Sequence, residues 1–382
     1  RDDDLDGLDN EQEAQLGTDP ALRDTDGDGF SDYVEVQHGT DPNTFAGHRL
    51  KVTFCGYNEK STLANFPALI KLDDGISGFD YETFLSPNGH DLRIWNSNQT
   101  ATLNYEIDTW KTGGVSLIWV QVPALVSSND CLWLTWGVPT WTSQPAYAIN
   151  GAMWSENYIG VWHMNSTDPE DATGNGNDGS GTGVSLNGGV VGEGADFDGN
   201  GSIIDITHAY KLPVYTNGTG NRFTFEGWVK GPDQSGLRYF GMGNTNDNTM
   251  HYSYLSRAGT VGRGRVFIRD DQFQNLQISE TGMTEFDNTW RHLVWVDDVG
   301  TLDHWVDGFQ DSTDFDYTTN TITLNTTTFG ALRRTLVSHG IDGIIDEFRI
   351  SDGLRSSNWI YTTWQNVDQY GSFLCPGPVE SA

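Results

Sequence analysis

An acidic repeat at the start of the chain constrains its folding more than any other feature. Residues 1–44 hold fourteen Asp and Glu residues against two Arg residues, so this short segment carries −12 of the formal net charge of −32. The segment has few apolar groups to bury, and its charges repel one another. It can therefore become compact only if its carboxylates are neutralised. The alternative is a solvated acidic tail.

Two patterns favour bound cations over a solvated tail. The segment repeats every 22 residues, since 2–7 aligns with 24–29 and 16–20 aligns with 38–42. Within each copy, side-chain oxygens occur at positions 1, 3, 5, 9 and 12 around a glycine at position 6, which is the spacing of an EF-hand calcium loop. The predicted Ca²⁺ ligands, with the backbone carbonyls of Leu8 and Phe30 at position 7, are Asp2, Asp4, Asp6, Asn10 and Glu13 in the first copy and Asp24, Asp26, Asp28, Asp32 and Glu35 in the second.

This pattern resembles the thrombospondin type 3 repeats of bacterial surface proteins. Both copies combine the acidic loop with Gly-Thr-Asp-Pro, and the first copy departs from the family pattern at Asn10, which removes one charge and should weaken that site. The resemblance implies a calcium-loaded rod, with Asp19 and Asp41 as further ligands between units. We therefore expect residues 1–46 to form a calcium-binding segment whose ordering depends on the ion.

The pattern changes from Leu50 onward to short apolar runs bounded by turn residues, with almost no helical periodicity. Such runs predict a β-sandwich over 47–145. The predicted strands are 50–54, 66–72, 91–95, 103–107, 115–122 and 132–136. This stretch resembles an uncharacterised bacterial domain family that often precedes laminin-G-like domains, and the segments that carry the resemblance are 79–81, 91–94, 105–110 and 119–123. The family has no known activity to transfer.

A second, larger sandwich is predicted over 146–372. Strands at 293–296 and 304–306 are followed by the hairpin-turn signal Asp307-Gly308. The stretch resembles the laminin-G-like, concanavalin A-like jelly roll through segments 161–164, 171–179, 195–199, 223–229, 290–292 and 345–350. The predicted fold class is therefore all-β, with two tandem β-sandwich (jelly-roll) domains preceded by a short calcium-binding repeat segment. The tail, 373–382, is either a loose end or an extended strand lent to a neighbour.

Catalytic patterns are weak. Glu106-Ile107-Asp108 begins the Glu-x-Asp-x-x-Glu signature that laminarinase-like glycoside hydrolases carry on a related jelly roll, but Lys111 replaces its last carboxylate and the triplet lies in the first sandwich. Asp346 and Glu347 are adjacent in a predicted strand, so they point to opposite faces and cannot flank one glycosidic bond. The laminin-G resemblance implies that they pair internally. The histidines show no metal-binding spacing, and no phosphate-binding loop is present. We therefore predict no catalytic residues and no enzyme activity.

Two further features bear on ligand binding. The loop 171–179 concentrates Asp and Asn residues, which indicates either Asx turns, the interpretation that we favour, or a third calcium site. The chain also contains fourteen Trp residues. Trp228 and Trp295 lie in predicted strands and should be buried. Three others, in loops or near the end of the chain, are less constrained and are candidates for stacking on sugar rings: Trp141, Trp154 and Trp364.

Three cysteines allow one disulfide and leave one thiol over. Cys55 follows the first predicted strand of the first sandwich and Cys131 begins its last, and such strands are commonly neighbours. We therefore favour a Cys55–Cys131 bond, with Cys375 free or intermolecular, although the other pairings stay open. Asn-x-Ser/Thr sequons, which permit glycosylation, occur at Asn98, Asn165, Asn200, Asn217 and Asn325.

Charge and hydropathy narrow the class of function. The net charge of −32 argues against nucleic-acid binding, which needs clustered Lys and Arg, and no apolar run is long enough to insert into a bilayer. Because the chain begins at Arg1, we expect a mature or truncated product. Our leading hypothesis is a secreted, non-catalytic structural protein of a bacterial cell surface or extracellular filament, in which copies of the chain associate head to tail. The alternative is a carbohydrate-binding module, with a glycan partner, of an adhesin or polysaccharide-degrading protein.

Overall fold

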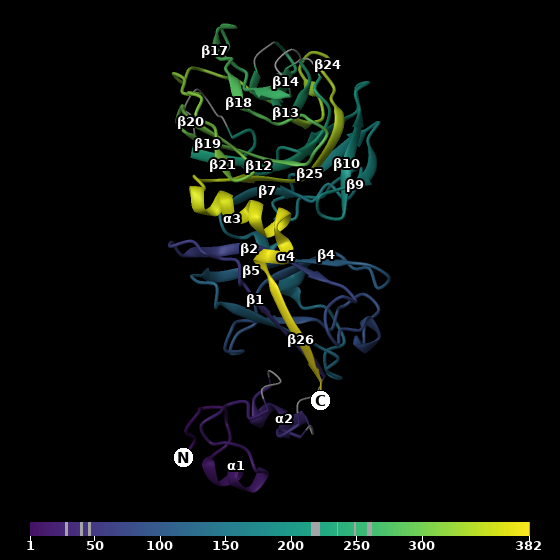
Figure 1. Ribbon diagram of the computed structural model, residues 1–382, viewed down its shortest axis with the longest axis vertical. Coiled ribbons are helices and arrows are strands. Elements are labelled where there is room, and N and C mark those ends of the chain that lie inside the picture. The colour runs from purple at the N-terminus through teal and green to yellow at the C-terminus, as the bar shows by residue number, and fades with distance from the viewer. Residues whose placement is uncertain are drawn as a thin grey trace. The chain divides into compact units, whose positions relative to one another are not determined.

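The computed structural model describes residues 1–26, 30–38, 41–44, 47–214, 222–234, 236–247, 250–257 and 262–381. The chain forms two compact units (Figure 1). Unit 1 contains residues 1–149 together with 371–382, and unit 2 contains residues 150–370. Both units are built mainly of antiparallel sheets, which confirms the all-β prediction.

Unit 1 begins with two short helices, each following one acidic loop. They are α1 (Asn10–Leu16) and α2 (Asp32–His38). Asp9 caps α1 by accepting hydrogen bonds from the N–H groups of Glu11 and Gln12, and the Gln12 side chain accepts one from the Asp9 N–H. This reciprocal pair is a capping box, which lets so short a helix begin at a defined residue.

The sandwich of unit 1 packs two sheets face to face. One has the strand order β26-β1-β6-β3 and the other the order β2-β5-β4. The bounds are β1 (His48–Thr53), β2 (Leu63–Leu72), β3 (Arg93–Trp95), β4 (Tyr105–Thr109), β5 (Ser116–Leu125), β6 (Cys131–Trp136) and β26 (Cys375–Ser381), with short 3-10 turns at Tyr81–Thr83 and Ala146–Ala148. Alternate residues are buried, as Leu50 and Val52 show on β1. Each of the six strands predicted here overlaps an observed one.

The C-terminal tail is neither loose nor lent to a neighbour. It forms β26, which pairs antiparallel with β1 from Cys375 opposite Thr53 to Ser381 opposite His48, and Figure 1 shows its yellow ribbon among the blue strands of unit 1. Unit 1 is therefore discontinuous in sequence, and unit 2 is inserted between its two parts. Local sequence patterns contain no signal for this return, because the tail and β1 are more than 300 residues apart.

The favoured disulfide pairing is wrong. Cys55 is bonded to Cys375, with a Cα–Cα distance of 5.9 Å, and Cys131 is a half-buried free thiol. The strand order explains the error, because β1 lies between β26 and β6. Thr53 at the end of β1 therefore lies opposite Cys375 on one side and Cys131 on the other, so both cysteines are close to Cys55. Beyond that end the chain turns towards the tail, where the Gly56 N–H donates to the Phe373 carbonyl at 3.1 Å.

Unit 2 is a larger sandwich of two antiparallel sheets. The first has the order β21-β20-β19-β12-β25-β10-β9 with β7 on β25, and the second has the order β17-β16-β14-β13-β22-β11-β8 with β15 and β18 attached. In the first sheet the bounds are β7 (Tyr158–Trp162), β9 (Ser185–Gly188), β10 (Glu193–Asp198), β12 (Arg222–Lys230), β19 (Arg291–Asp298), β20 (Thr301–Val306), β21 (Phe309–Gln310) and β25 (Asp342–Ser351). In the second they are β8 (Gly179–Thr182), β11 (Ile203–Ile206), β13 (Arg238–Gly243), β14 (Met250–Arg257), β15 (Arg263–Arg265), β16 (Ile268–Arg269), β17 (Asn275–Gln277), β18 (Glu280–Thr284) and β22 (Thr326–Phe329).

Smaller elements complete unit 2. A hairpin joins β23 (Leu332–Arg333) to β24 (Val337–Ser338), Ala152–Trp154 forms a 3-10 turn, and α3 (Ser357–Asp368) leads into α4 (Tyr370–Phe373) at the boundary with unit 1. Ile360 of α3 packs on Val294 and Val296 of β19, so the helix covers part of the outer face of the first sheet. The predicted hairpin turn is confirmed, since Asp307 and Gly308 have φ of 52° and 82° between β20 and β21.

The core of unit 2 lies between its two sheets and is rich in aromatic rings. Phe225, Phe240, Phe329 and Phe348 contact one another with centroid separations of 4.6 to 6.5 Å. Trp228 and Trp295 are buried, as predicted, with 1 % and 5 % of their surfaces exposed. Among the candidate sugar-stacking residues, Trp154 is buried while Trp141 and Trp364 are half-buried.

Candidate functional site

The first acidic loop gathers its carboxylates around one point. Single oxygens of Asp2, Asp4 and Asp6 all lie within 4.8 Å of one another. The Asp2 carboxylate accepts the Leu5 N–H at 2.6 Å, and Asp6 Oδ1 accepts the Leu8 N–H at 2.7 Å. These local hydrogen bonds fold the loop back on itself and hold three like charges together, which is unfavourable without a counterion.

Several oxygens of this loop are buried without a hydrogen-bond donor in the part of the chain that the structure describes. They are both carboxylate oxygens of Glu13, Asp4 Oδ2 and Asn10 Oδ1. Burial, followed by the charges of Asp4 and Asp6, raises the pKa of Glu13, and burial raises the pKa of Asp4. Buried acceptors of this kind are destabilising unless something satisfies them. Hard oxygen donors that converge from a twelve-residue loop fit a calcium ion.

The second loop is partly outside the described residues, and the predicted ligand Asp28 lies outside them. Asp32 and Glu35 are buried, with 0 % and 1 % of their surfaces exposed. The Asp32 carboxylate accepts hydrogen bonds from the Thr25 N–H at 2.8 Å and from Thr25 Oγ1 at 2.7 Å.

The two copies are linked in a way that the sequence analysis missed. Asp6 Oδ2 of the first loop accepts the Tyr33 N–H of α2 at 2.8 Å. Asp32, which the spacing assigns to the second site, has a raised pKa through burial, and the Asp6 charge of the first loop contributes to that rise. Repeat spacing alone describes each copy separately, so it gave no signal for this contact.

The Asx-turn interpretation of loop 171–179 agrees with the structure. Asp171 Oδ1 accepts the Thr173 N–H at 3.0 Å and the Val161 N–H at 3.2 Å, and its Oδ2 accepts the Asn177 N–H at 3.1 Å. The Asn177 carboxamide accepts the Tyr210 N–H at 2.9 Å. The loop therefore uses its polar side chains to hold the backbone of Ala209 and Tyr210, and Tyr210 lines a pocket.

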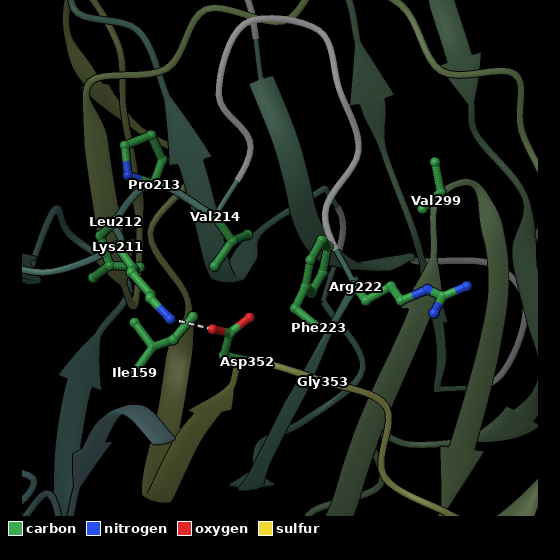
Figure 2. A pocket seen from close by; sticks show the side chains of 10 residues that line it. All are labelled: Ile159, Lys211, Leu212, Pro213, Val214, Arg222, Phe223, Val299, Asp352 and Gly353. Atoms are coloured by element: carbon green, nitrogen blue, oxygen red, sulfur yellow. Dashed lines mark hydrogen bonds and ion pairs between the residues drawn. The ribbon is translucent and has the colours of Figure 1, made fainter. Parts of the chain in front are cut away.

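Two adjoining pockets open in unit 2. A polar pocket of about 200 Å³ is lined by Tyr158, Thr173, Asn175, Tyr210, Lys211 and Asp352, among others. A larger cavity of about 680 Å³ combines the apolar side chains of Leu212, Val214, Phe223 and Val299 with charged groups. Both pockets share the Lys211–Asp352 ion pair, whose side chains face each other in Figure 2.

The polar groups at this pair are held in defined positions. Hydrogen bonds to Asp352 and Tyr210 raise the pKa of Lys211, and its ammonium lies 5.2 Å from the centroid of the Tyr210 ring. Asn157 and Lys211 both have positive φ, at 62° and 51°. For a lysine this left-handed conformation is uncommon, and it fixes the direction of the Lys211 side chain. The pair can offer hydrogen bonds of both kinds to a neutral polar ligand.

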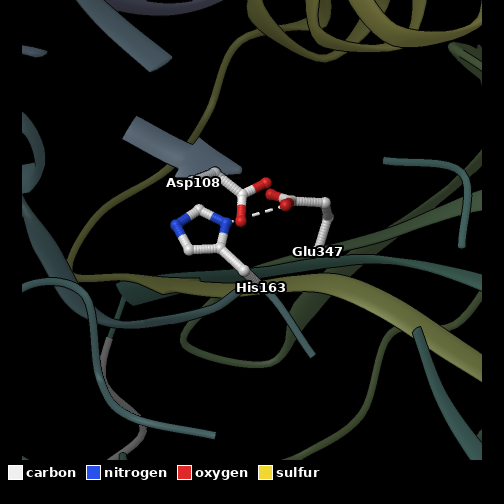
Figure 3. Close-up of side chains that lie close together, drawn as sticks. All are labelled: Asp108, His163 and Glu347. Carbon is white, nitrogen blue, oxygen red and sulfur yellow. Dashed lines mark hydrogen bonds and ion pairs between the residues drawn. The ribbon is translucent and has the colours of Figure 1, made fainter. Parts of the chain in front are cut away.

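The carboxylates of β25 pair internally, as the laminin-G resemblance implied. Glu347 Oε1 lies 2.7 Å from His163 Nδ1 (Figure 3), and Glu347 Oε2 accepts a hydrogen bond from Arg349 at 2.8 Å. Burial alone would raise the pKa of Glu347, but His163 and Arg349 outweigh it and lower that pKa. Asp346 instead accepts the Val191 N–H at 2.9 Å. Both carboxylates are at most 2 % exposed and serve the packing of the sheet.

Family models match three stretches of the chain. Residues 2–21 and 24–44 match the bacterial TSP3 repeat, residues 88–152 match a domain of unknown function (DUF2341), and residues 204–361 match the concanavalin A-like lectin/glucanases superfamily. These matches confirm the three resemblances drawn from the sequence. The chain thus combines segments similar to bacterial TSP3 repeats, to a domain of unknown function and to the concanavalin A-like superfamily.

Solved structures resemble part of the chain. The binding domain of Paraclostridial Mosquitocidal Protein 1 is 14% identical over 55% of this chain and 52% of its own, with a TM-score of 0.43. Domain 4 of AbnA, a GH43 extracellular arabinanase from Geobacillus stearothermophilus in complex with arabinotriose, is 19% identical over 54% of this chain and 98% of its own, with a TM-score of 0.41. The binding domain of botulinum neurotoxin serotype D is 14% identical over 57% of this chain and 52% of its own, with a TM-score of 0.43.

The chain spans about half the length of these two toxin chains. At these scores the likenesses carry no argument about function. No curated protein matches the chain.

Proposed function

We propose that the protein is a secreted, calcium-stabilised carbohydrate-binding protein, and that the two pockets around Lys211 and Asp352 in unit 2 hold the saccharide. The observation that carries this proposal is the ion pair shared by a polar pocket and a larger, partly apolar cavity. It lies in the unit that contains the match to the lectin/glucanases superfamily.

The two pockets suit the two kinds of surface that a sugar presents. The cavity of about 680 Å³ falls within the roughly 300–1,000 Å³ of small-molecule sites. Val299, an exposed apolar residue of its lining, can pack against the C–H face of a sugar ring. Lys211 and Asp352 can exchange hydrogen bonds with hydroxyl groups, while Thr173 and Asn175 extend the polar lining.

Calcium would stabilise the repeat segment without taking part in chemistry. In the first loop, Asp2, Asp4, Asp6 and Glu13 would supply carboxylates, Asn10 its side-chain oxygen and Leu8 its carbonyl. In the second loop, the same positions are Asp24, Asp26, Asp28, Asp32, Glu35 and the Phe30 carbonyl. The supporting observation is the set of buried oxygens without donors in the first loop. A bound Ca²⁺ would satisfy them and reduce the repulsion among the carboxylates.

A non-catalytic role is part of the proposal. The strongest candidate carboxylates, Asp346 and Glu347, are buried and paired with groups of their own unit. A hydrolase would need two carboxyl groups that reach one glycosidic bond from solvent.

Secretion is supported by the disulfide and by the type of repeat. Disulfides persist in oxidising compartments outside the cytosol, and Cys55–Cys375 is bonded here. Among the described residues, every helix is too short or too polar to cross a bilayer. Four sequon asparagines, Asn98, Asn165, Asn200 and Asn325, are exposed, while Asn217 lies outside the described residues. Head-to-tail assembly of copies stays a prediction, and it would need a surface other than the tail.

A glycan array with the full chain in millimolar Ca²⁺ tests the binding proposal. The informative variant is Lys211→Ala with Asp352→Ala, which removes the shared ion pair and leaves the net charge unchanged. The matched control is Arg265→Ala with Glu280→Ala, an ion pair between β15 and β18 outside both pockets. We expect the first double variant to lose at least tenfold in affinity and the control to keep its affinity. An array with no bound saccharide, or equal effects of both variants, would contradict the proposal.

A further inference from the structure

The outer face of the β26-β1-β6-β3 sheet in unit 1 carries aromatic rings among cations. The inward residues Leu50, Val52, Leu132 and Leu134 are buried in the sandwich, so the residues that alternate with them face away from the core. We call this surface the Trp face. Its members are Arg49, Lys51, Arg93, Trp95, Trp133 and Trp141.

The strand register aligns these side chains into rows. Lys51 of β1 lies opposite Trp133 of β6, which in turn lies opposite Trp95 of β3. Residues that are opposite one another on adjacent strands have Cβ atoms roughly 5 Å apart. The result is a row of one cation and two indole rings that runs across the strands.

The contacts on the Trp face are cation–π and aromatic. The Arg49 guanidinium lies 5.1 Å and the Lys51 ammonium 5.8 Å from the Trp133 ring centroid. The Trp95 and Trp141 centroids are 6.4 Å apart, and Trp95 Nε1 donates to Thr135 Oγ1 at 2.7 Å. The three indole rings are half-buried, and Trp141 is contacted by the Phe30 ring at a centroid separation of 5.4 Å, so Trp95 and Trp133 are the rings left for stacking.

The charge of the face is opposite to that of the rest of the protein. Three of the eight Lys and Arg residues in 1–149 lie here, in a chain whose net charge is −32. Arg49 pairs with Glu380 at 2.7 Å, and Arg93 donates to the carbonyls of Leu92 and Ser143 at 2.7 and 3.0 Å. Lys51 is exposed and has no carboxylate within ion-pair distance among the described residues.

We propose that the Trp face binds an anionic polysaccharide built of uronic-acid residues. Sugar rings would stack on Trp133 and Trp95, while carboxylates of the polymer would pair with Lys51 and share the Arg49 guanidinium with Glu380. Cations beside partly exposed rings suit a polymer that carries one carboxylate on each sugar ring. Double-stranded DNA, with one charge per roughly 1.7 Å of helix axis, requires a denser cluster of Lys and Arg. This site lies in unit 1 and is independent of the pockets in unit 2.

Isothermal titration of the full chain with oligogalacturonate, in saturating Ca²⁺, tests the inference. Lys51→Glu changes only an exposed side chain, and Lys111→Glu, at an exposed lysine between β4 and β5 of the other sheet, is the matched charge control. We expect Lys51→Glu to weaken binding about tenfold, because it replaces an attraction with a repulsion, and Lys111→Glu to change it less than twofold. Trp133→Ala should abolish binding while the melting transition of unit 1 is retained.

Equal weakening by Lys51→Glu and Lys111→Glu would show a non-specific effect of charge and overturn the inference. Equal affinity for oligothymidylate would identify the face as a single-strand stacking surface and overturn it as well. If the Lys211→Ala/Asp352→Ala variant loses oligogalacturonate binding and Lys51→Glu does not, the ligand occupies the pockets of unit 2. In that case the Trp face is not the site, and the proposed function stands.

Discussion

The Cys55–Cys375 disulfide gives the sharpest test of the discontinuous architecture. The bond joins residues 320 positions apart, and unit 2 lies between them. If unit 1 unfolds while unit 2 remains folded, the free chain inside the closed loop consists of 56–149 and 371–374, roughly 100 residues. Loop-closure entropy for that length stabilises unit 1 by about 4.7 kcal/mol. If both units unfold together, the loop of 320 residues raises the value to about 5.7 kcal/mol.

The perturbation is Cys55→Ser with Cys375→Ser, measured by urea unfolding in Ca²⁺. We expect a loss of about 4–5 kcal/mol in the free energy of unfolding of unit 1, because the bond restricts only its unfolded chain. The transition of unit 2 should stay within about 1 kcal/mol. Cys131→Ser is the matched control, since that thiol is free and half-buried. Peptide mapping without reductant should recover a Cys55–Cys375 peptide.

Two results would refute this reasoning. A loss below about 1 kcal/mol in the double variant would show that the bond does not restrict the unfolded chain as calculated. A destabilised Cys131→Ser variant together with a Cys55–Cys131 peptide would show that the pairing itself is different.

Three other predictions follow from buried groups. Chelation of Ca²⁺ should expose residues 1–46 to proteolysis, and protease resistance in chelator would contradict this. Glu13→Gln should weaken Ca²⁺ binding by at least tenfold in calorimetry, because it removes a buried carboxylate from the predicted ligand set, and an unchanged affinity would contradict that assignment. Burial, with a contribution from Arg349, lowers the pKa of His292 to about 3. Below pH 6.5 this histidine therefore takes up a proton in the unfolded chain but stays neutral in the folded unit. The stability of unit 2 should therefore fall by up to about 1.4 kcal/mol per pH unit between pH 6.5 and 3, and His292→Phe should flatten that slope in denaturation curves. Phe348→Ala should destabilise unit 2 by about 3–5 kcal/mol in thermal melts, because the ring contacts Phe225, Phe240 and Phe329 in the core; a loss below 1 kcal/mol would contradict that packing.

Local sequence patterns predicted the strands of the first sandwich up to β6. Each of the six apolar runs of the first sandwich became part of a strand, because alternation of buried and exposed side chains is a local property of the chain. Asp307-Gly308 predicted its turn for a similar reason, since positive φ at two successive positions depends on those residues alone. The Asx-rich loop 171–179 likewise stabilises itself mainly through hydrogen bonds between near neighbours.

The candidate sites were only partly predictable. Ligand types and spacing in the acidic loops are a local signal, and the structure brings Asp2, Asp4 and Asp6 together as that signal implied. Lys211 and Asp352 gave no signal, because they are 141 residues apart and meet only when the strands of unit 2 pack. The candidate Trp residues were chosen from loops, yet Trp154 is buried, because neighbouring elements decide which loop residues face solvent.

The sequence by itself determined the acidic loops, the first six strands and the three resemblances, because each depends on residue types at short, fixed spacing. Only the tertiary structure decided that the last seven-residue strand returns to unit 1, that Cys55 pairs with Cys375 rather than Cys131, and which side chains share the pockets and the Trp face. These outcomes depend on which strands become neighbours. That choice is made by packing across the whole fold, between residues whose separation along the chain carries no local pattern.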